Sequence, residues 1–283
     1  MRIAFATCSA HAAGRPDDAE VAALVGGEFA VWNDPSVDWH AYDRVVIRSV
    51  WDYSQHVDEF LAWCDHVGEA RLHNRPSLIR FNSDKRYLAA LAVPTAPTTF
   101  LEPGTPLPAY DTEIVVKPNV SAGARDTGRF APDAADDAAE LVHTIQASGR
   151  TALVQPYLPA VDREGETAIV FFGGSFSHAL HKRPVLREAG VAPLADGAHS
   201  PAAVMLDEDL VGPGQATEAQ LRLAHDVIGE ISERFGQPVY ARVDVATGTD
   251  GEPVLMELEL IEPRLYLEFA PGSVERFAAA IDV

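Results

Sequence analysis

The stretch LMELELIEP, residues 255–263, restricts the fold more than any other part of the sequence. Its apolar and acidic residues alternate, which is typical of a β-strand. Glu257 and Glu259 would then project to the same side, and Glu262 follows near the end of the stretch. Two like charges side by side destabilise a strand unless a cation lies between them or one acid stays protonated. The strand therefore faces either a cation or, in the simpler alternative, bulk solvent.

A second strand that would accompany it lies just upstream. Residues 239–245 form a β-branched run around Asp244, and a turn rich in Gly, Asp and Pro follows. We expect this run and residues 254–260 to form a hairpin that brings Asp244 close to Glu257. Three carboxylates would then converge. Such hard oxygen ligands suit Mg²⁺, which completes its shell with water and phosphate oxygens.

Composition limits the class of protein and its partners. The chain has 283 residues, 47% of them hydrophobic, which is enough for a sizeable core. It carries 42 acidic residues against 22 basic ones, which argues against nucleic acid or an anionic membrane as a partner. The first ten residues lack the features of a signal peptide and no run approaches a membrane span, so we expect a cytoplasmic protein. Cys8 and Cys64 have no metal or redox spacing, so we expect reduced thiols.

Strands and helices alternate over the first 80 residues, which predicts a parallel sheet. Residues 16–27 have Pro at a helix start and Gly at its end, and a second helix is expected from an N-cap at Ser54 to Gly68. A short helix carrying Lys85 follows, and then the Pro-rich residues 93–112, which we expect to be a surface connection.

From residue 113 the pattern becomes strand, Gly-containing loop, helix and strand. A hairpin turning at Gly173 and Gly174, a long helix, the acidic hairpin and a terminal helix complete the chain. This mixture of α and β elements predicts an α/β fold with antiparallel parts. We place the domain boundaries near residues 80 and 158, which gives an N-terminal α/β domain (1–80), a central subdomain (81–158) and a C-terminal subdomain (159–283).

The loop after residues 113–118 has the features of an anion site. Lys117 ends a buried strand, and Ser121, Gly123, Thr127 and Gly128 lie in the loop that follows. Small residues let backbone amides approach an anion, and the neighbouring Lys adds charge. The spacing matches neither GxxxxGK[ST] nor GxGxxG. An ordinary β-hairpin turn is an equally good interpretation of this loop alone.

The ordered series DKRYL, VVKP, the loop, LVQPYL, GETAIVF and the three acids resembles the ATP-grasp superfamily over nearly the whole chain. The resemblance implies an N-terminal α/β lobe followed by two lobes that clamp ATP. It implies phosphate contacts from Lys85 and Lys117, closure of the loop bearing Ser121, Gly123 and Thr127, an adenine hinge at Gln155, Tyr157 and Leu158, and a ribose contact at Glu166. It also implies Asp244, Glu257 and Glu259 as ligands of two Mg²⁺ ions, with Mn²⁺ as the alternative ion.

The chain departs from the superfamily pattern at two positions. Glu259 stands where many relatives have Asn, which adds a negative charge to the metal site. Ala168 stands where many relatives have an Arg that contacts the transferring phosphate. Our candidate for that catalytic charge is Arg183, with Lys182 as the second choice. The alternative is that both belong to a solvated loop.

Polar residues in VVIRSVWDY, residues 45–53, appear where a buried strand ends, which is the usual place for ligand contacts in open α/β sheets. We therefore name Arg48, Ser49, Asp52 and Tyr53 as substrate-binding candidates. The Arg would hold a carboxylate and the Asp an ammonium group. The alternative is that Arg48 pairs with Asp52 while the aromatic residues pack the lobe junction. Arg264 is a further carboxylate candidate.

Within the superfamily, RSVWDY, VVKPNVSAGARDT, FSHALHKRP and LMELELIEP resemble the cyclo-ligases of D-cycloserine biosynthesis. The resemblance implies that ATP phosphorylates the carboxylate of O-ureido-D-serine and that the ureido nitrogen closes an isoxazolidinone ring, with loss of CO₂ and ammonia. Two alternatives are an intermolecular ligase that joins amino acids or small amines, and a regulatory module that binds ATP without chemistry. The expected partner is a small amino-acid-like substrate, and a homo-oligomer is left open.

Overall fold

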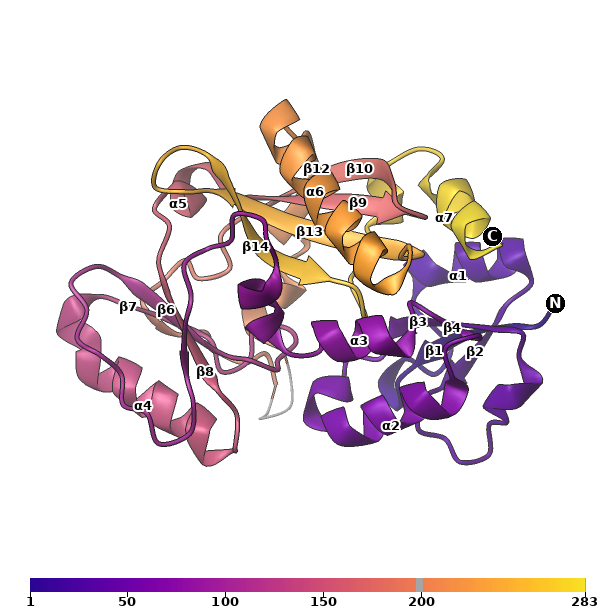
Figure 1. The fold of residues 1–283 in the computed structure, drawn as a ribbon, viewed down its shortest axis with the longest axis horizontal. Helices are drawn as coiled ribbons and strands as arrows, with labels where there is room; N and C mark the ends of the chain where they lie inside the picture. The colour runs from indigo at the N-terminus through magenta and orange to yellow at the C-terminus, as the bar shows by residue number, and fades with distance from the viewer. Residues whose placement is uncertain (197–200, 283) are drawn as a thin grey trace.

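The computed structural model describes residues 1–196 and 201–282 as sheets covered by helices (Figure 1). The first sheet is parallel, with strand order β2-β1-β3-β4. Its strands are β1 (Ile3–Thr7), β2 (Glu28–Val31), β3 (Arg44–Ser49) and β4 (Leu72–His73). Its helices are α1 (Pro16–Val25), α2 (Val57–Val67) and α3 (Pro76–Asn82). The predicted N-terminal parallel sheet is confirmed.

The second sheet has the order β11-β7-β6-β8-β5 and is covered by α4 (Ala135–Ala147). Its strands are β5 (Thr99–Leu101), β6 (Ile114–Pro118), β7 (Gly128–Phe130), β8 (Ala152–Pro156) and β11 (Gly190–Val191). The Pro-rich residues 93–112 are therefore more than a surface connection, because they supply the edge strand β5. Strand β11 also joins this sheet from a later part of the chain.

The third sheet is antiparallel, with the order β12-β10-β9-β13-β14. Its strands are β9 (Glu166–Phe172), β10 (Ser175–Lys182), β12 (Val211–Gly214), β13 (Tyr240–Thr247) and β14 (Pro253–Glu259). Helices α5 (Ala160–Glu164), α6 (Glu218–Phe235) and α7 (Ser273–Ile281) accompany it. In Figure 1 this sheet lies above both others, and α7 packs on α1 beside the two termini. The predicted turn at Gly173 and Gly174 joins β9 to β10, and both glycines have positive φ.

One helix boundary differs from its sequence prediction. The N-cap of α2 is His56, not Ser54, because residues 53–55 form a separate 3₁₀ turn. The Ser54 hydroxyl instead accepts a hydrogen bond from Arg125 at 2.5 Å. Gly68 ends the helix as predicted. The turn thus links the N-terminal lobe to the loop between β6 and β7.

The first and third sheets share a hydrophobic core. Phe5 and Val46 pack in one cluster with Tyr240 and Phe277, and the rings of Phe172 and Phe277 stack with centroids 4.9 Å apart. The Tyr240 hydroxyl lies 2.7 Å from the carbonyl oxygens of Ile47 and Ile261. Burial of large aromatic side chains is the main favourable term in such packing. This core therefore fixes the end of β14 against the end of β3.

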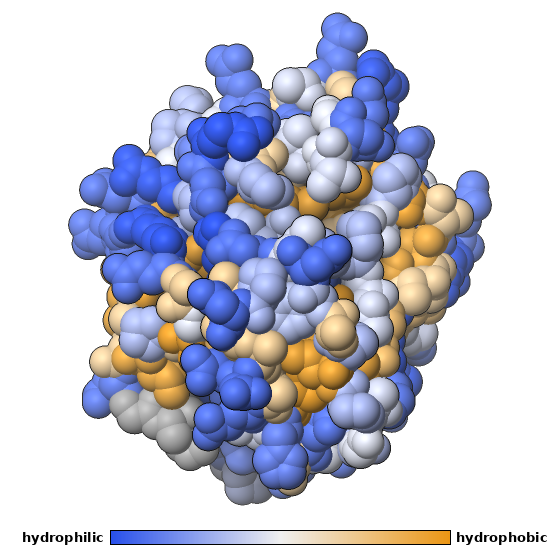
Figure 2. Space-filling view, turned by 90° about the vertical axis from the view of Figure 1, so that its left-hand side faces the viewer, coloured by the Kyte–Doolittle hydropathy of each residue, from blue (hydrophilic) through white to orange (hydrophobic). Residues whose placement is uncertain are grey.

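The surface carries no large apolar face on the side shown in Figure 2, which is mostly hydrophilic with small hydrophobic patches. Among the described helices, none is both long and apolar enough to cross a membrane. Cys8 and Cys64 are buried free cysteines, as predicted. Burial raises the pKa of both thiols.

Candidate active site

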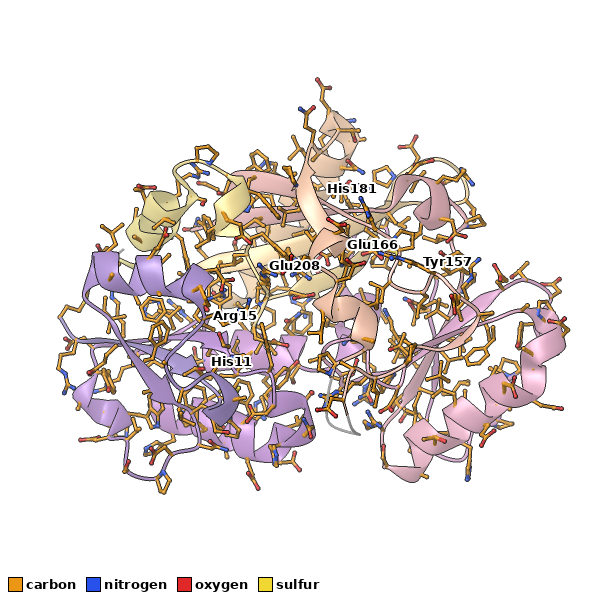
Figure 3. The ribbon with its side chains drawn as sticks, turned by 180° about the vertical axis from the view of Figure 1, so that it is seen from behind. His11, Arg15, Tyr157, Glu166, His181 and Glu208 are labelled. Atoms are coloured by element: carbon orange, nitrogen blue, oxygen red, sulfur yellow. The ribbon has the colours of Figure 1, made fainter. Side chains whose placement is uncertain are left out.

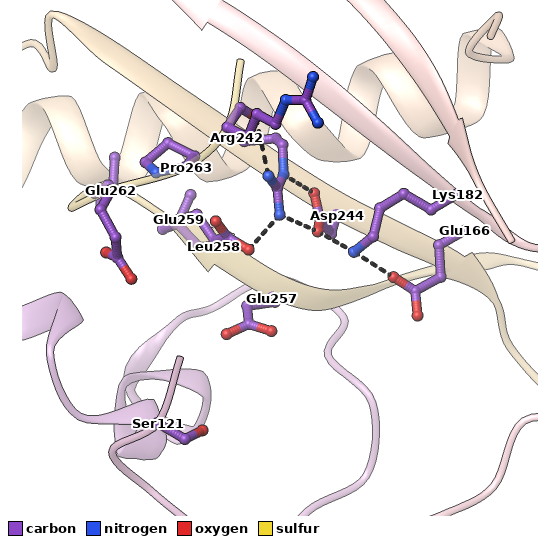
Figure 4. Close-up of polar contacts among 12 residues, drawn as sticks. Ser121, Glu166, Lys182, Arg242, Asp244, Glu257, Leu258, Glu259, Glu262 and Pro263 are labelled. Atoms are coloured by element: carbon purple, nitrogen blue, oxygen red, sulfur yellow. Dashed lines mark hydrogen bonds and ion pairs between the residues drawn. The ribbon is translucent and has the colours of Figure 1, made fainter. Parts of the chain in front are cut away.

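The predicted hairpin brings the acidic side chains to one face of the third sheet. Strands β13 and β14 pair in a register that sets Asp244 opposite Glu257 and Arg242 opposite Glu259. Directly opposed residues of an antiparallel pair share a face, so the three acids lie side by side. Figure 4 shows this face with Glu166 at one end and Glu262 at the other. Protein cations lie between several of the carboxylates.

Lys182 is the first of these cations. Its Nζ donates to Glu166 at 3.0 Å and to Asp244 at 2.5 Å. Asp244 is fully buried. Burial alone would raise the pKa of Asp244, but Arg242 and Lys182 outweigh it and lower that pKa to about 2. Conversely, Asp244 and Glu166 raise the pKa of Lys182 against the effect of burial. The carboxylate and the ammonium group therefore stay ionised together.

Arg242 is the second cation, and our sequence analysis missed it. Its Nε and Nη2 donate to the two oxygens of Asp244 at 2.9 and 3.0 Å, and Nη2 also contacts Glu259. The residue is buried and lies on the same face as Ala168, where many relatives were expected to have an Arg. Its position two residues before Asp244 in an alternating strand was the available signal, because it places both side chains on one face.

Glu259 adds a negative charge to the site, because it stands where many members of the superfamily have Asn. Burial raises its pKa, Arg242 lowers it, and Asp244 and Glu257 raise it again, to about 7. The charge of Glu259 is met within the site by one buried guanidinium rather than by solvent.

Lys85 and Lys117 approach the same acids from other parts of the chain, the 3₁₀ helix Lys85–Ala90 and strand β6. Lys85 Nζ lies 3.2 Å from Glu257 and donates to the backbone oxygen of Ser121 at 3.0 Å. Lys117 is the last residue but one of β6, and burial lowers its pKa although Glu257 raises it. Burial raises the pKa of Glu257, but Lys85 and Lys117 outweigh that effect and lower it. The two lysines predicted to contact phosphates thus converge on one carboxylate.

The loop between β6 and β7 packs tightly against later parts of the chain. Gly123 has a φ of +65°, and a Cβ there would lie 2.7 Å from Pro201. The Gly123 carbonyl accepts a hydrogen bond from Ala202, and the Thr127 carbonyl accepts one from Ala192. The Ser121 hydroxyl lies 3.2 Å from Lys85 Nζ. Glycine is therefore required at residue 123 by both conformation and space.

The predicted adenine hinge lies at the junction of the second and third sheets. Gln155, Tyr157 and Leu158 are buried, and the last two pack with Ala246. The Tyr157 hydroxyl donates to Asp162 at 2.6 Å, and the Arg129 guanidinium lies 3.5 Å from its ring centroid. Figure 3 labels Tyr157 and Glu166 away from His11 and Arg15, which lie on the N-terminal lobe.

Arg183 lies apart from this cluster. It is exposed, and its backbone N–H donates to Leu210. It directly follows Lys182, whose side chain contacts Glu166 and Asp244. Of the two catalytic candidates, the structure therefore places the second choice, Lys182, among the acids.

The four candidates from residues 45–53 are occupied by contacts within the N-terminal lobe and its junction. Arg48 is buried and pairs with Asp18 at 2.7 Å, not with Asp52 as the alternative interpretation held. The Ser49 hydroxyl also donates to Asp18, and the Asp52 carboxylate accepts from Trp32 at 2.9 Å. Tyr53 is buried, and burial raises its pKa well above the usual value.

Arg264 borders a separate cavity of about 360 Å³ with Arg15, Asp17 and Glu20 among its lining residues. Its Nη2 donates to Glu268 at 2.8 Å, and its guanidinium lies over the Tyr266 ring. The backbone oxygen of Arg264 accepts from Arg242 at 3.0 Å. Arg264 therefore lines the cavity and also accepts, through its backbone oxygen, a hydrogen bond from Arg242 on the acidic face.

The acids on this face offer the kind of oxygen donors that magnesium binds. Within residues 1–196 and 201–282, no group of three or more His, Cys, Asp or Glu side chains is arranged to hold a metal ion. Asp244 and Glu257 nevertheless offer opposed carboxylates on one face, and hard oxygen donors are those that Mg²⁺ prefers. Their present partners are Lys182, Arg242 and Lys85. The chemistry of the donors fits Mg²⁺, with protein cations in the place of metal.

The fold matches solved ATP-grasp structures. D-alanine–D-alanine ligase from Bacillus anthracis complexed with ATP aligns with a TM-score of 0.60 and 14% identity, over 100% of this chain and 95% of that chain. At that identity the likeness shows the fold. The chain therefore has the fold of the ATP-grasp ligases, which confirms the predicted fold.

Closer relatives identify the family. Residues 3–74 match the family model of the D-cycloserine synthetase DcsG N-terminal domain. The cycloserine biosynthesis protein DcsG of Streptomyces lavendulae is 35% identical over 274 residues, covering 91% of this chain and 88% of that protein. The crystal structure of D-cycloserine synthetase DcsG aligns with a TM-score of 0.86 and 34% identity, over 99% of this chain and 98% of that chain. The chain belongs to the DcsG family.

The contact of Lys182 with two buried acids predicts a loss of stability on its removal. At pH 7 we expect Lys182→Met to lower the free energy of unfolding by about 3 kcal/mol or more, because Asp244 and Glu166 lose their shared cation. The exposed neighbour gives the control, and Arg183→Met should change it by at most about 0.5 kcal/mol. Urea unfolding measures both values.

The difference in unfolding free energy between wild type and Lys182→Met should become smaller at low pH. The folded pKa of Asp244, about 2, lies below the usual value of 3.8, so the stabilisation is complete above pH 3.8 and is lost as the pH falls towards 2. The gap between wild type and Lys182→Met should therefore shrink between pH 4 and pH 2. Equal losses in the Lys182 and Arg183 variants at pH 7 would contradict the assignment of a buried pair.

Proposed function

We propose that this protein is an ADP-forming cyclo-ligase that converts O-ureido-D-serine, ATP and water into D-cycloserine, with ADP, phosphate, CO₂ and ammonia as the other products. The observation that carries the proposal is the 35% identity to the cycloserine biosynthesis protein DcsG across 91% of the chain. The cations and acids on one face of the third sheet also support it, because phosphoryl transfer needs such charges.

ATP would lie between the second and third sheets. Lys85 and Lys117 would contact its phosphates, and Lys182 and Arg242 would meet the transferring phosphoryl group from the opposite sheet. Such transfer depends mainly on positioning and on neutralising the charge of the equatorial oxygens. Tyr157 and Leu158 lie in a buried apolar cluster that suits an adenine ring, and Glu166, at the start of β9, would contact a ribose hydroxyl.

Asp244, Glu257 and Glu259 would hold Mg²⁺, with two ions proposed and Mn²⁺ as an alternative ion. When bound, magnesium neutralises phosphate charge and orients the triphosphate. To hold Mg²⁺, the acids would have to lose contacts that Lys182, Arg242 and Lys85 make with them in this structure. The three cations would then be available for the phosphate oxygens. Residues 121–128, held by residues 192 and 202, would shield the reacting groups from water.

The reaction has two chemical steps on one substrate. A carboxylate oxygen of O-ureido-D-serine attacks the γ-phosphorus of ATP, forming an acyl phosphate and releasing ADP. The ureido nitrogen bonded to oxygen then attacks the acyl carbon, the C–O bond to phosphate breaks, and the ring closes with loss of the N–H proton. Water then removes the carbamoyl group as CO₂ and ammonia. Because nucleophile and acyl group belong to one molecule, effective concentration supplies much of the rate.

We also propose three general features of the protein. The chain divides into domains near residues 80 and 158, the protein is cytoplasmic, and a homo-oligomer is an open alternative to a monomer. The partner is a small amino-acid-like substrate, and neither nucleic acid nor membrane takes part. The acidic composition, 42 acidic against 22 basic residues, supports this choice of partner.

The substrate is tested by ADP release with MgATP. O-ureido-D-serine alone should release ADP and yield one D-cycloserine per ADP, because no second amine is needed. The L isomer and common amino acids, singly or in pairs, serve as controls. ADP release that requires a pair of amino acids would contradict the cyclo-ligase and favour the intermolecular ligase.

The assignment of the acids is tested by one substitution and its matched control. Glu257→Gln should lower turnover by about 100-fold or more, because it removes a charged group that faces both lysines and the metal position. Glu252→Gln, the same chemical change at an exposed position of the same hairpin, should leave turnover unchanged. Similar rates for the two variants would remove Glu257 from the proposed metal site.

A further inference from the structure

The backbone of residues 261–263 is fixed by contacts from the N-terminal lobe and from β13. The Ile261 carbonyl oxygen lies 2.7 Å from the Tyr240 hydroxyl. The Glu262 carbonyl accepts from Trp51 Nε1 at 3.2 Å, and the Pro263 carbonyl accepts from Arg48 Nη2 at 3.0 Å. Arg48 is itself held by Asp18. The Glu262 side chain therefore starts from a rigid position directly beyond β14.

The Glu262 carboxylate differs from the other acids on this face. Asp244, Glu257 and Glu259 each contact a Lys or Arg within the cleft. In the described part of the chain, no side chain forms a hydrogen bond or ion pair with the Glu262 carboxylate, whose one donor is the backbone N–H of the same residue. Figure 4 shows it extending to the same side of the strand as Glu257.

The surroundings of Glu262 favour a positively charged ligand. The residue is half-buried, and burial together with Glu259 raises its pKa to about 8, although Lys85 lowers it. Burial and the neighbouring acid disfavour the ionised form of Glu262, and a cation that donates hydrogen bonds to the carboxylate would stabilise that form. Asp52, the ammonium-binding candidate from the sequence, already accepts from Trp32.

From these contacts we infer that Glu262 binds the α-ammonium group of the amino-acid substrate and thereby determines specificity. The inference rests on the proposed function and adds to it the group that recognises the substrate's amine. The substrate carboxylate must face Lys182 and Arg242 to receive the phosphoryl group, and the ammonium group lies on the adjacent carbon. Glu262 lies at the opposite end of the acidic face from Glu166 and Lys182, so it would meet the substrate on the side away from that pair.

The test compares O-ureido-D-serine with 3-(ureidooxy)propanoate, which has hydrogen in place of the amino group. With wild-type protein, kcat/KM from ADP release should be about 10- to 100-fold higher for the aminated compound, because a charge-assisted hydrogen bond is lost without the amine. Glu262→Gln should remove this preference by lowering kcat/KM for the aminated compound, mainly through KM. Its kcat/KM for 3-(ureidooxy)propanoate should stay within about twofold of wild type.

Two further variants complete the design. Glu262→Asp keeps the charge and should retain part of the preference even if Glu262→Gln fails to fold, which loss of ATP binding would reveal. Glu252→Gln at the exposed turn should retain the whole preference. Equal losses for both compounds in the Glu262 variants, or a wild-type preference below twofold, would overturn the inference alone. A wild-type protein that forms no ADP with either compound would overturn the proposed function and the inference together.

Discussion

The buried charges on the third sheet determine how the rest of this protein is arranged. Asp244 is fully buried beside Glu257 and Glu259, and it is stable there because Lys182 and Arg242 bind its oxygens. Removing either cation would leave an uncompensated buried charge, which is among the most destabilising changes in a protein. The site is thus a balanced set of charges in which each of these acids has a protein cation as its partner.

The lobes hold this set of charges in place. The core that joins Phe5 and Val46 to Tyr240 and Phe277 fixes the N-terminal sheet to the third sheet. The buried Arg48–Asp18 pair then reaches across to the Pro263 carbonyl, so the residues beyond β14 are held by the end of β3. Arg48 therefore acts in this structure as a structural link rather than as a group open to substrate.

Local patterns in the sequence were sufficient to predict most of the helices and strands and to place the acids on one face. Alternation fixed the faces of β13 and β14, and the order of motifs indicated the ATP-grasp fold. Contacts between segments distant in the sequence were not accessible in the same way. No local pattern relates Arg48 to Asp18 rather than Asp52, or assigns strand pairing to the Pro-rich β5. Arg242 was the exception, because the alternation that placed Asp244 also places the Arg two residues earlier.

An oxygen isotope label tests most directly whether ATP phosphorylates the substrate carboxylate. O-ureido-D-serine labelled with ¹⁸O in both carboxylate oxygens is incubated with MgATP, and the inorganic phosphate is examined by ³¹P NMR. If the carboxylate is phosphorylated and the nitrogen displaces phosphate, each phosphate formed carries one ¹⁸O. Phosphate without the label, formed together with D-cycloserine, would contradict the acyl phosphate route and with it the role given to the charged face of the third sheet.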